Sequence, residues 1–178
     1  MRLPVSRPVR VLVVCTGNIC RSPMGERMLA DELERAGVDA DVTSGGTSDY
    51  EVGNPIDPRA ASTLHRRGVP VEAHTARQVT AEDLGAVDLV LAMTEEHAVW
   101  LRRLAERSGV DPGVIMLWRA AEGPDAPGAG SARDVGSLDV PDPWWGDDSD
   151  FESTYELLAP GARMLAAALA AGRTELHP

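Results

Sequence analysis

A cysteine and an arginine six positions apart carry the clearest chemical signal in this sequence. Cys15 begins a loop that ends at Arg21, and Gly17 and Asn18 between them are residue types that tolerate left-handed backbone angles. A loop of this kind curls its backbone N–H groups inward. At a helix N-terminus, these dipoles and a guanidinium together bind a tetrahedral oxyanion. The stretch therefore predicts an anion site with a sulfur nucleophile at its edge.

The surroundings of Cys15 favour its reactive form. A thiolate is stabilised by a helix N-terminus, by nearby arginine and by hydroxyl donors, and Arg21 and Ser22 supply the last two. We therefore expect Cys15 to attack phosphorus, while the planar fork of Arg21 grips two phosphoryl oxygens. The alternatives are an inert cysteine at a strand end and a surface arginine, although the charge of such an arginine would oppose the helix dipole.

Phosphoryl transfer from an ester also requires a proton for the leaving oxygen. Asp142 is the candidate donor, because it stands between two prolines and is followed by Trp144 and Trp145. An aspartate between prolines is commonly just a turn former. Two adjacent tryptophans in a proline-rich loop, however, are suited to wall a slot for a flat aromatic leaving group.

The elements that position these residues follow from the hydrophobic pattern. Apolar runs predict strands at 9–14, 38–44, 87–93 and 114–117, and amphipathic segments predict helices at 23–36, 58–67, 95–107 and about 150–171, with a short one after Thr80. The expected N-caps are Ser22, Asp57, Thr80, Thr94 and Ser149, the last in a capping box with Glu152. Pro160-Gly161 should kink or split the final helix.

Strands that alternate with helices indicate an α/β fold, with a parallel sheet covered by helices on both faces. Ligands of such sheets lie beyond the carboxyl ends of the strands, so the four loops that follow the strands should open on one edge. The last of these, 119–140, is predicted to be a long surface loop without a packed core, and we interpret its Gly/Pro-rich stretch 123–131 as an insert that alters acid positioning or partner choice.

The whole chain bounds the function further. Its 178 residues suggest a flexible extension at 1–8, one domain at 9–172 and a tail at 173–178. A net charge of −11 argues against a nucleic-acid surface, and no apolar run is long enough to cross a membrane. No apolar leader precedes the domain and both cysteines lie in one loop, so we expect a cytoplasmic protein.

Taken together, four segments resemble the low-molecular-weight protein tyrosine phosphatases. They are Val14–Pro23, Ser44–Pro55, His74–Thr80, and Asp142–Gly146 with Asp150–Glu152 after it. A bare Cys-x5-Arg pattern occurs in several phosphatase folds, whereas this ordered set is specific to the one family. The resemblance implies a flavodoxin-like, three-layer fold with a four-stranded parallel sheet. It also implies hydrolysis of phosphotyrosine monoesters through a phosphocysteine intermediate, with a tyrosine-phosphorylated protein as substrate, phosphate or similar oxyanions as ligands, and neither metal nor cofactor.

The resemblance also implies a role for each site residue. Cys15 would be the nucleophile, and Asp142 would protonate the phenolate and later activate water. The phosphate-binding loop would be Thr16, Gly17, Asn18, Ile19, Cys20, Arg21 and Ser22. Asn18 would be held by Ser22, Ser44 and His74, and specificity would come from Ile19, Tyr50, Trp144 and Trp145. Cys15 and Cys20 would form a reversible, protective disulfide.

Several alternatives can be weighed against this interpretation. Arsenate reduction on the same fold needs resolving cysteines beyond the loop, and the chain has none. Phosphoarginine hydrolases of the family carry threonine where this chain has Ile19, and they lack the aromatic pair. A non-catalytic phosphate-binding module would not need an intact Cys15, Arg21, Ser22 and Asp142.

Two other classes lack their motifs, and one position departs from the family pattern. The four histidines and two cysteines match no zinc spacing, and no Gly-x4-Gly-Lys loop is present. Many family members have Met-Asp where this chain has Met93-Thr94. Because threonine can still cap the helix, we expect altered loop contacts rather than lost activity.

Overall fold

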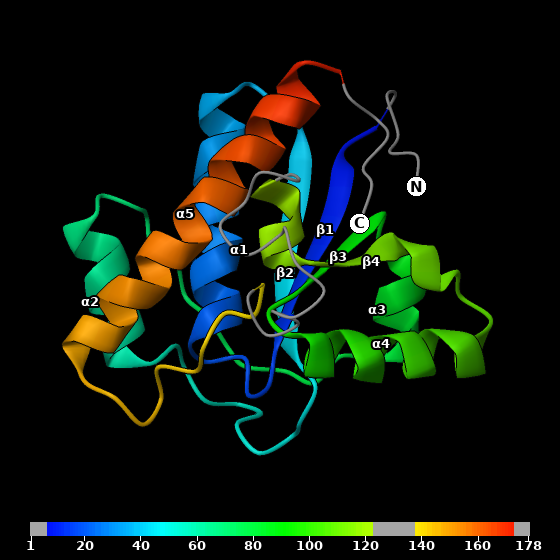
Figure 1. The fold of residues 1–178 in the computed structure, drawn as a ribbon, viewed down its shortest axis with the longest axis horizontal. Coiled ribbons are helices and arrows are strands. Elements are labelled where there is room, and N and C mark those ends of the chain that lie inside the picture. The colour runs from blue at the N-terminus through cyan, green and yellow to red at the C-terminus, as the bar shows by residue number, and fades with distance from the viewer. Residues whose placement is uncertain (1–6, 123–137, 173–178) are drawn as a thin grey trace.

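The computed structural model describes residues 7–122 and 138–172 of the chain. Within these residues, four parallel strands form one sheet in the order β2-β1-β3-β4, namely β1 (Val9–Cys15), β2 (Ala40–Gly46), β3 (Leu89–Ala92) and β4 (Ile115–Leu117). The helices are α1 (Arg21–Arg35), α2 (Pro58–Arg66), α3 (Ala81–Ala86), α4 (Glu95–Ser108), α5 (Asp148–Ala170) and the 3-10 turns η1 (Pro112–Val114) and η2 (Trp118–Glu122). The predicted α/β fold is confirmed (Figure 1).

The central strand β1 is buried on both faces, as its continuously apolar sequence indicates. Val11 and Val13 belong to the apolar cluster that includes α1, α2 and α5, whereas Leu12 and Val14 belong to the cluster that includes α3 and α4. The alternation follows from the two-residue period of a strand. Two helical layers therefore enclose the sheet, one on each face.

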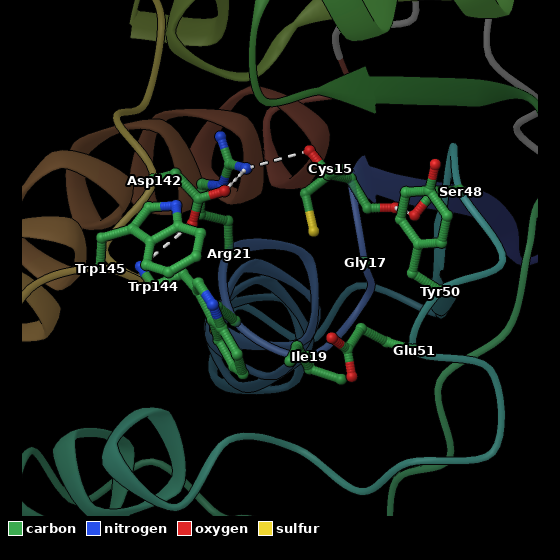
Figure 2. Close-up of a pocket in the computed structure, with 12 residues that line it drawn as sticks. Cys15, Gly17, Ile19, Arg21, Ser48, Tyr50, Glu51, Asp142, Trp144 and Trp145 are labelled. Carbon is green, nitrogen blue, oxygen red and sulfur yellow. Dashed lines mark hydrogen bonds and ion pairs between the residues drawn. The ribbon is translucent and has the colours of Figure 1, made fainter.

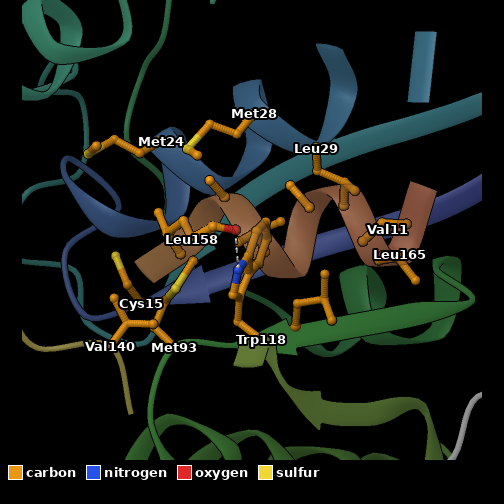
Figure 3. Close-up of a cluster of buried hydrophobic side chains, with 14 of the residues drawn as sticks. Val11, Cys15, Met24, Met28, Leu29, Met93, Trp118, Val140, Leu158 and Leu165 are labelled. Atoms are coloured by element: carbon orange, nitrogen blue, oxygen red, sulfur yellow. Dashed lines mark hydrogen bonds between the residues drawn. The ribbon is translucent and has the colours of Figure 1, made fainter. Parts of the chain in front are cut away.

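Trp118 is the largest side chain of the first cluster and is 1% exposed. Its indole Nε1–H donates to the carbonyl oxygen of Leu158 at 3.0 Å (Figure 3). A Cβ placed on Gly25 would lie 3.0 Å from the Trp118 ring, and one placed on Gly161 would lie 2.7 Å from Nε1. Trp118 thus joins α1 and α5, because each helix presents a glycine to the indole.

All four strands end at the same edge, as predicted. Cys15, the last residue of β1, pairs with Gly46 at the end of β2, and Val14 pairs with Ala92 at the end of β3. The chain passes from β1 to β2 on one side and then returns to β3 on the other. Sheets of this kind bind ligands at such a switch point, which here lies directly beyond Cys15.

The predicted caps of three helices are confirmed, and those of two are wrong. Asp57, Thr80 and Thr94 cap α2, α3 and α4. Helix α1 begins at Arg21, so Ser22 lies inside its first turn and the N-cap, Cys20, makes no side-chain cap bond. The Ser22 hydroxyl is used instead by the loop before it, as described below.

The final helix also begins differently from the prediction. Asp147 and Asp150 form its capping box, whereas Glu152 pairs with Arg66 and Arg67 at the end of α2. The helix continues through Pro160 without the expected split. Its buried face packs on Trp118 and α1 both before and after Pro160.

All four strands differ from their predicted ranges by one or two residues at one or both ends. β2 begins at Ala40 because Val38 belongs to the turn that ends α1, where its N–H donates to the Leu33 carbonyl and Gly37 has a φ of 69°. β3 is confined to Leu89–Ala92, and Val114 belongs to η1 rather than β4.

Three expected segments lie wholly or mostly outside the described residues, namely most of the extension 1–8, all of the tail 173–178 and all of the insert 123–131. We expected 119–140 to be a surface loop, and its described ends correct this. Arg119 and Val140 are buried, and Val140 N–H donates to the Met93 carbonyl. In the part of the chain that the structure covers, no helix is both long enough and apolar enough to span a membrane.

Candidate active site

A pocket of about 230 Å³ opens at the carboxyl edge of the sheet, beyond β1 (Figure 2). Segments distant in the sequence contribute to it: the loop after β1, the loop after β2 and the segment before α5. Its lining contains Cys15, Thr16, Gly17, Ile19, Cys20, Arg21, Ser48, Tyr50, Glu51, Asp142, Trp144 and Trp145. The structure thus brings most of the predicted site residues together in one pocket.

The loop from Cys15 to Arg21 is tightly curled around Asn18, which is fully buried and has a φ of 59°. Its side-chain amide donates to Ser22 Oγ at 2.9 Å and to Ser44 Oγ at 2.8 Å. His74 Nε2–H donates to the Asn18 main-chain carbonyl at 2.7 Å. Ser44 and His74 lie behind the loop rather than in the pocket lining, where they support its conformation.

Two further groups that sequence reasoning missed complete the support of the loop. The Arg77 backbone N–H donates to Asn18 Oδ1 at 3.0 Å, and Ser44 Oγ donates to Glu26 Oε2 at 2.5 Å. Glu26 is only 5% exposed, although it lies on an otherwise ordinary amphipathic helix. A carboxylate four positions after Ser22 would fall on the same helix face, and this spacing is the only signal in the sequence.

Cys15 lies at the N-terminus of α1 and is 2% exposed. Its Sγ is 3.1 Å from Ser22 Oγ, whose proton has the Gly45 carbonyl at 3.3 Å as a second acceptor. The helix N-terminus and a hydroxyl donor are two of the features that stabilise a thiolate. The geometry thus provides the environment expected of a sulfur nucleophile.

Cys20 is buried at the pocket floor, and both cysteines are free thiols. Burial raises the pKa of the Cys20 thiol, and the negative charges of Asp57 and of a Cys15 thiolate raise it further. Cys20 therefore stays protonated, whereas Cys15 is placed to react. A Cys15–Cys20 disulfide stays a prediction.

Arg21 and Asp142 form an ion pair on one wall of the pocket, with 2.5 Å between Arg21 NH2 and Asp142 Oδ2. Arg21 is 4% exposed, and NH1 donates to the Val140 carbonyl at 3.2 Å. Its Nε–H is buried without a hydrogen-bond partner among the described residues. The guanidinium is therefore fixed in place and keeps one N–H without an acceptor among the described residues.

Aromatic side chains form the rim of the pocket. Figure 2 shows Trp144 and Trp145 on one side of the Cys15 sulfur and Tyr50 on the other. Tyr50 and Trp145 are 87% and 91% exposed, whereas Ile19 is nearly buried at the base. Between these walls lies a slot that suits a flat ring whose phosphate reaches Cys15.

His97, in the first turn of α4, is another residue that sequence reasoning missed. Its Nε2 lies 2.9 Å from Thr16 Oγ1 and its Nδ1 lies 2.9 Å from Thr94 Oγ1. Burial, and then the charge of Arg21, lowers the pKa of His97 to about 4. The neutral imidazole therefore positions Thr16, which in turn accepts a hydrogen bond from Arg21 NH2 at 3.3 Å.

Among residues 7–122 and 138–172, no group of three or more histidine, cysteine or acidic side chains is arranged to hold a metal ion. The chemistry available in the pocket is that of a buried sulfur at a helix N-terminus, an arginine and the carboxyl group of Asp142. Such a set can transfer a phosphoryl group from an ester to sulfur.

Comparison with known proteins finds the same architecture. The family model described as low molecular weight phosphotyrosine protein phosphatase matches residues 10–175. The chain is 42% identical over 156 residues to low molecular weight protein-tyrosine phosphatase A of Mycobacterium tuberculosis, covering 86% of this chain and 87% of the relative. It is 36% identical over 148 residues to the human low molecular weight phosphotyrosine protein phosphatase, covering 82% and 86%.

Solved structures agree with the sequence matches. YfkJ from Bacillus subtilis superposes with a TM-score of 0.80 and 29% identity, covering 96% of this chain and 99% of that one. Wzb from Vibrio vulnificus in complex with benzylphosphonate superposes with a TM-score of 0.72 and 30% identity, covering 89% of this chain and 97% of that one. The YwlE arginine phosphatase gives 0.73 and 27%, covering 90% and 95%.

Proposed function

The chain belongs to the low molecular weight phosphotyrosine protein phosphatase family and is a protein-tyrosine phosphatase, and from this premise we propose the part that each residue plays. The observation that carries the proposal is the convergence of the Cys15 sulfur, Arg21 and Asp142 on one pocket. In the first step, Cys15 Sγ attacks phosphorus, the S–P bond forms and the bond to the phenolic oxygen breaks. Protonated Asp142 donates its proton to that oxygen.

Arg21 and the loop amides hold the transferred group. The unpartnered Nε–H of Arg21 supports this role, because a buried donor without an acceptor is costly unless a ligand completes it. Binding of three equatorial phosphoryl oxygens requires several donors around one point, and we expect the backbone amides of the curled loop at the α1 N-terminus to supply them.

In the second step, water attacks the phosphocysteine. Asp142, now a carboxylate, accepts the proton of the water, the S–P bond breaks and inorganic phosphate is released. The Ser22 hydroxyl, 3.1 Å from Sγ, stabilises the departing thiolate by donating its proton in a hydrogen bond.

The aromatic rim supports a tyrosine-phosphorylated protein as the substrate. Ile19, Tyr50, Trp144 and Trp145 can enclose a phenyl ring. Phosphoarginine is the competing substrate, because one similar structure is an arginine phosphatase. The bulk of the two tryptophans favours the phenyl ring. We also propose a cytoplasmic location, since a reducing compartment keeps a catalytic thiol active.

One panel of assays tests these assignments. The parent, Cys15→Ser and Asp142→Ala are assayed on p-nitrophenyl phosphate and on phosphotyrosyl, phosphoseryl and phosphoarginyl peptides. We expect the parent to prefer the phosphotyrosyl peptide, Cys15→Ser to be inactive, and Asp142→Ala to lose about 10²–10⁴-fold on that peptide. Full activity of Cys15→Ser would falsify the mechanism, and preference for phosphoarginine would overturn the substrate assignment.

A further inference from the structure

Arg59, in the first turn of α2, is held by a buried carboxylate beside the pocket. Asp57 is 6% exposed, and it accepts from Arg59 Nε at 3.1 Å and from Arg59 NH2 at 2.8 Å. Burial would raise the pKa of Asp57, but the hydrogen bonds from Arg59 hold this pKa below its usual range. The pair is therefore charged on both sides and geometrically fixed.

The other edge of the Arg59 guanidinium reaches the segment that carries Asp142. Its NH1 donates to the Gly146 carbonyl at 2.9 Å and its NH2 donates to the Trp144 carbonyl at 3.3 Å. The same group lies 5.7 Å from the Trp144 ring centroid and 4.5 Å from that of Phe151. One planar group thus joins α2 to the segment before α5 and to α5 itself.

Asp57 also ties this arrangement to the phosphate-binding loop, because its backbone N–H donates to the Ile19 carbonyl at 2.8 Å. The Asp57–Arg59 pair therefore connects the floor of the pocket to its aromatic wall. Neither residue contributes to the pocket lining, so both act through the residues that do.

Other contacts also hold Asp142 and the segment before it, and the ion pair with Arg21 is lost during turnover. Val140 N–H donates to the Met93 carbonyl at 2.8 Å, which anchors the segment upstream. The Asp142–Arg21 ion pair must loosen when Arg21 grips phosphate oxygens. The contacts of Arg59 with the Trp144 and Gly146 carbonyls do not involve the phosphate site, so they persist at the moment when Asp142 delivers its proton.

We propose that Arg59 is a positioning residue that fixes Asp142 and Trp144 at the pocket while the leaving group is protonated. This inference rests on the proposed role of Asp142. Trp144 is separated from Asp142 only by Pro143, and Trp144 N–H donates to Asp142 Oδ1 at 3.2 Å. Displacement of the Trp144 carbonyl would therefore move the carboxyl group directly.

Leaving-group acidity separates this role from simple structural support. Phenyl phosphate needs protonation of its leaving oxygen far more than p-nitrophenyl phosphate does, because p-nitrophenolate is the weaker base. We expect Arg59→Met, which keeps the apolar stem, to lower kcat/KM for phenyl phosphate by about tenfold to a hundredfold. The loss with p-nitrophenyl phosphate should be several times smaller. Arg59→Lys, which keeps the charge but lacks the planar fork, should show the same pattern.

Arg67→Met is the matched control. The Arg67 guanidinium also joins α2 to α5, 4.8 Å from the Tyr155 ring centroid and bonded to Glu152, but it lies away from the pocket lining. This variant should slow both substrates equally or neither. Thermal unfolding of each variant shows whether it is folded. If Arg59→Met does not fold, Arg59→Lys provides the test instead.

The outcomes separate the inference from the function on which it rests. If Asp142→Ala shows a leaving-group-dependent loss and neither Arg59 variant does, Arg59 is not a positioning residue, and the role of Asp142 stands. If Asp142→Ala itself lowers kcat/KM equally for both substrates, the proposed acid is wrong and the inference falls with it. A larger loss with phenyl phosphate than with p-nitrophenyl phosphate, in Asp142→Ala and in the Arg59 variants alike, supports the inference.

Discussion

Ser22 belongs to a chain of buried hydrogen bonds that begins at a carboxylate. Glu26 accepts the proton of Ser44, so the Ser44 oxygen is left to accept from Asn18. Asn18 donates its second amide proton to Ser22. Ser22 must then donate outward, and the charge of a Cys15 thiolate makes Sγ the preferred acceptor. A carboxylate remote from the pocket thereby orients the hydroxyl that faces the nucleophile.

His97 gives the first prediction at this scale, a loss of stability in mild acid. The unfolded chain takes up a proton on this residue near pH 6.5, whereas the folded chain resists until about pH 4. The unfolded state binds more protons in this interval, so stability falls as the pH falls. Between pH 7 and 5, the unfolding free energy should drop by about 2 kcal/mol more for the parent than for His97→Asn.

Urea denaturation of both proteins at pH 7 and 5 measures this difference. Asp57, Asp83 and Asp88 have lowered pKa values, so protonation of these carboxylates lowers the unfolding free energy only in stronger acid. They are also present in both proteins, so their contributions cancel. Equal pH dependence of the parent and the variant would show that His97 is protonated normally in the fold.

Residue-scale prediction from the sequence succeeds where local spacing defines the chemistry. Cys15 and Arg21 lie in one short loop, so their meeting could be predicted from spacing alone. Glu26, Arg59 and His97 could not be found this way, because each acts through a partner brought to it by the fold. A lone charged residue near a helix start has many ordinary interpretations, and only tertiary contacts distinguish them.

At the scale of elements, the end of β2 limits the space available to the phosphate-binding loop. A Cβ on Gly46 would lie 2.5 Å from the Thr16 carbonyl oxygen and 3.3 Å from the Asn18 nitrogen. Both are backbone atoms, so a methyl group here must displace the loop itself. The two elements are also bonded, because Thr47 N–H donates to the Cys15 carbonyl.

We therefore expect Gly46→Ala to lower kcat/KM by about tenfold or more, since a displacement of even 1 Å misplaces the oxyanion donors. Steady-state kinetics with p-nitrophenyl phosphate measures the loss. Gly85→Ala in α3 is the control, because its Cβ would meet only Val110 at 3.9 Å and alanine favours a helix. Parent-like kinetics in Gly46→Ala would mean that the loop adapts to the added methyl group.

Most helices and strands could be predicted from their own sequence, and the errors lie at some of their ends. Asp57, Thr80 and Thr94 cap helices where the local pattern said so. Ser22 also has the sequence of a cap, but its hydroxyl serves the Cys15 loop. Pro160 has the sequence of a helix breaker, yet packing on Trp118 keeps α5 continuous. In these cases, tertiary contacts outweigh the local preference.

At the scale of the molecule, Trp118 holds the layer of α1 and α5 against the sheet. We expect Trp118→Phe to lower the unfolding free energy by about 2 kcal/mol, because it leaves a cavity and removes the donor of the Leu158 carbonyl. Trp145→Phe is the matched control, since that indole is 91% exposed and its loss should cost less than about 0.5 kcal/mol. Urea denaturation measures the unfolding free energy of both variants. Equal losses in the two variants would show that Trp118 contributes no more to stability than the exposed Trp145.

The order of the strands was predictable only through the family resemblance. Alternation of strands and helices indicates a parallel sheet, but it leaves the position of β1 among its neighbours open. The structure sets β1 between β2 and β3, and this position places Cys15 at the switch point. The convergence of Asp142 on the same pocket depends on that order, so spacing alone could not give it.

The position of β1 also has a consequence for amide hydrogen exchange. Its backbone pairs with β2 over seven residues and with β3 over four, so Leu12, Val13 and Val14 exchange their amide protons only when the whole domain unfolds. Asp142 lies outside the sheet with an exposed side chain, so its amide should exchange faster than those of β1. We therefore expect the nucleophile to stand on the slowest-exchanging part of the fold and the acid on a faster-exchanging one, so local opening of the acid segment would leave the sulfur in place.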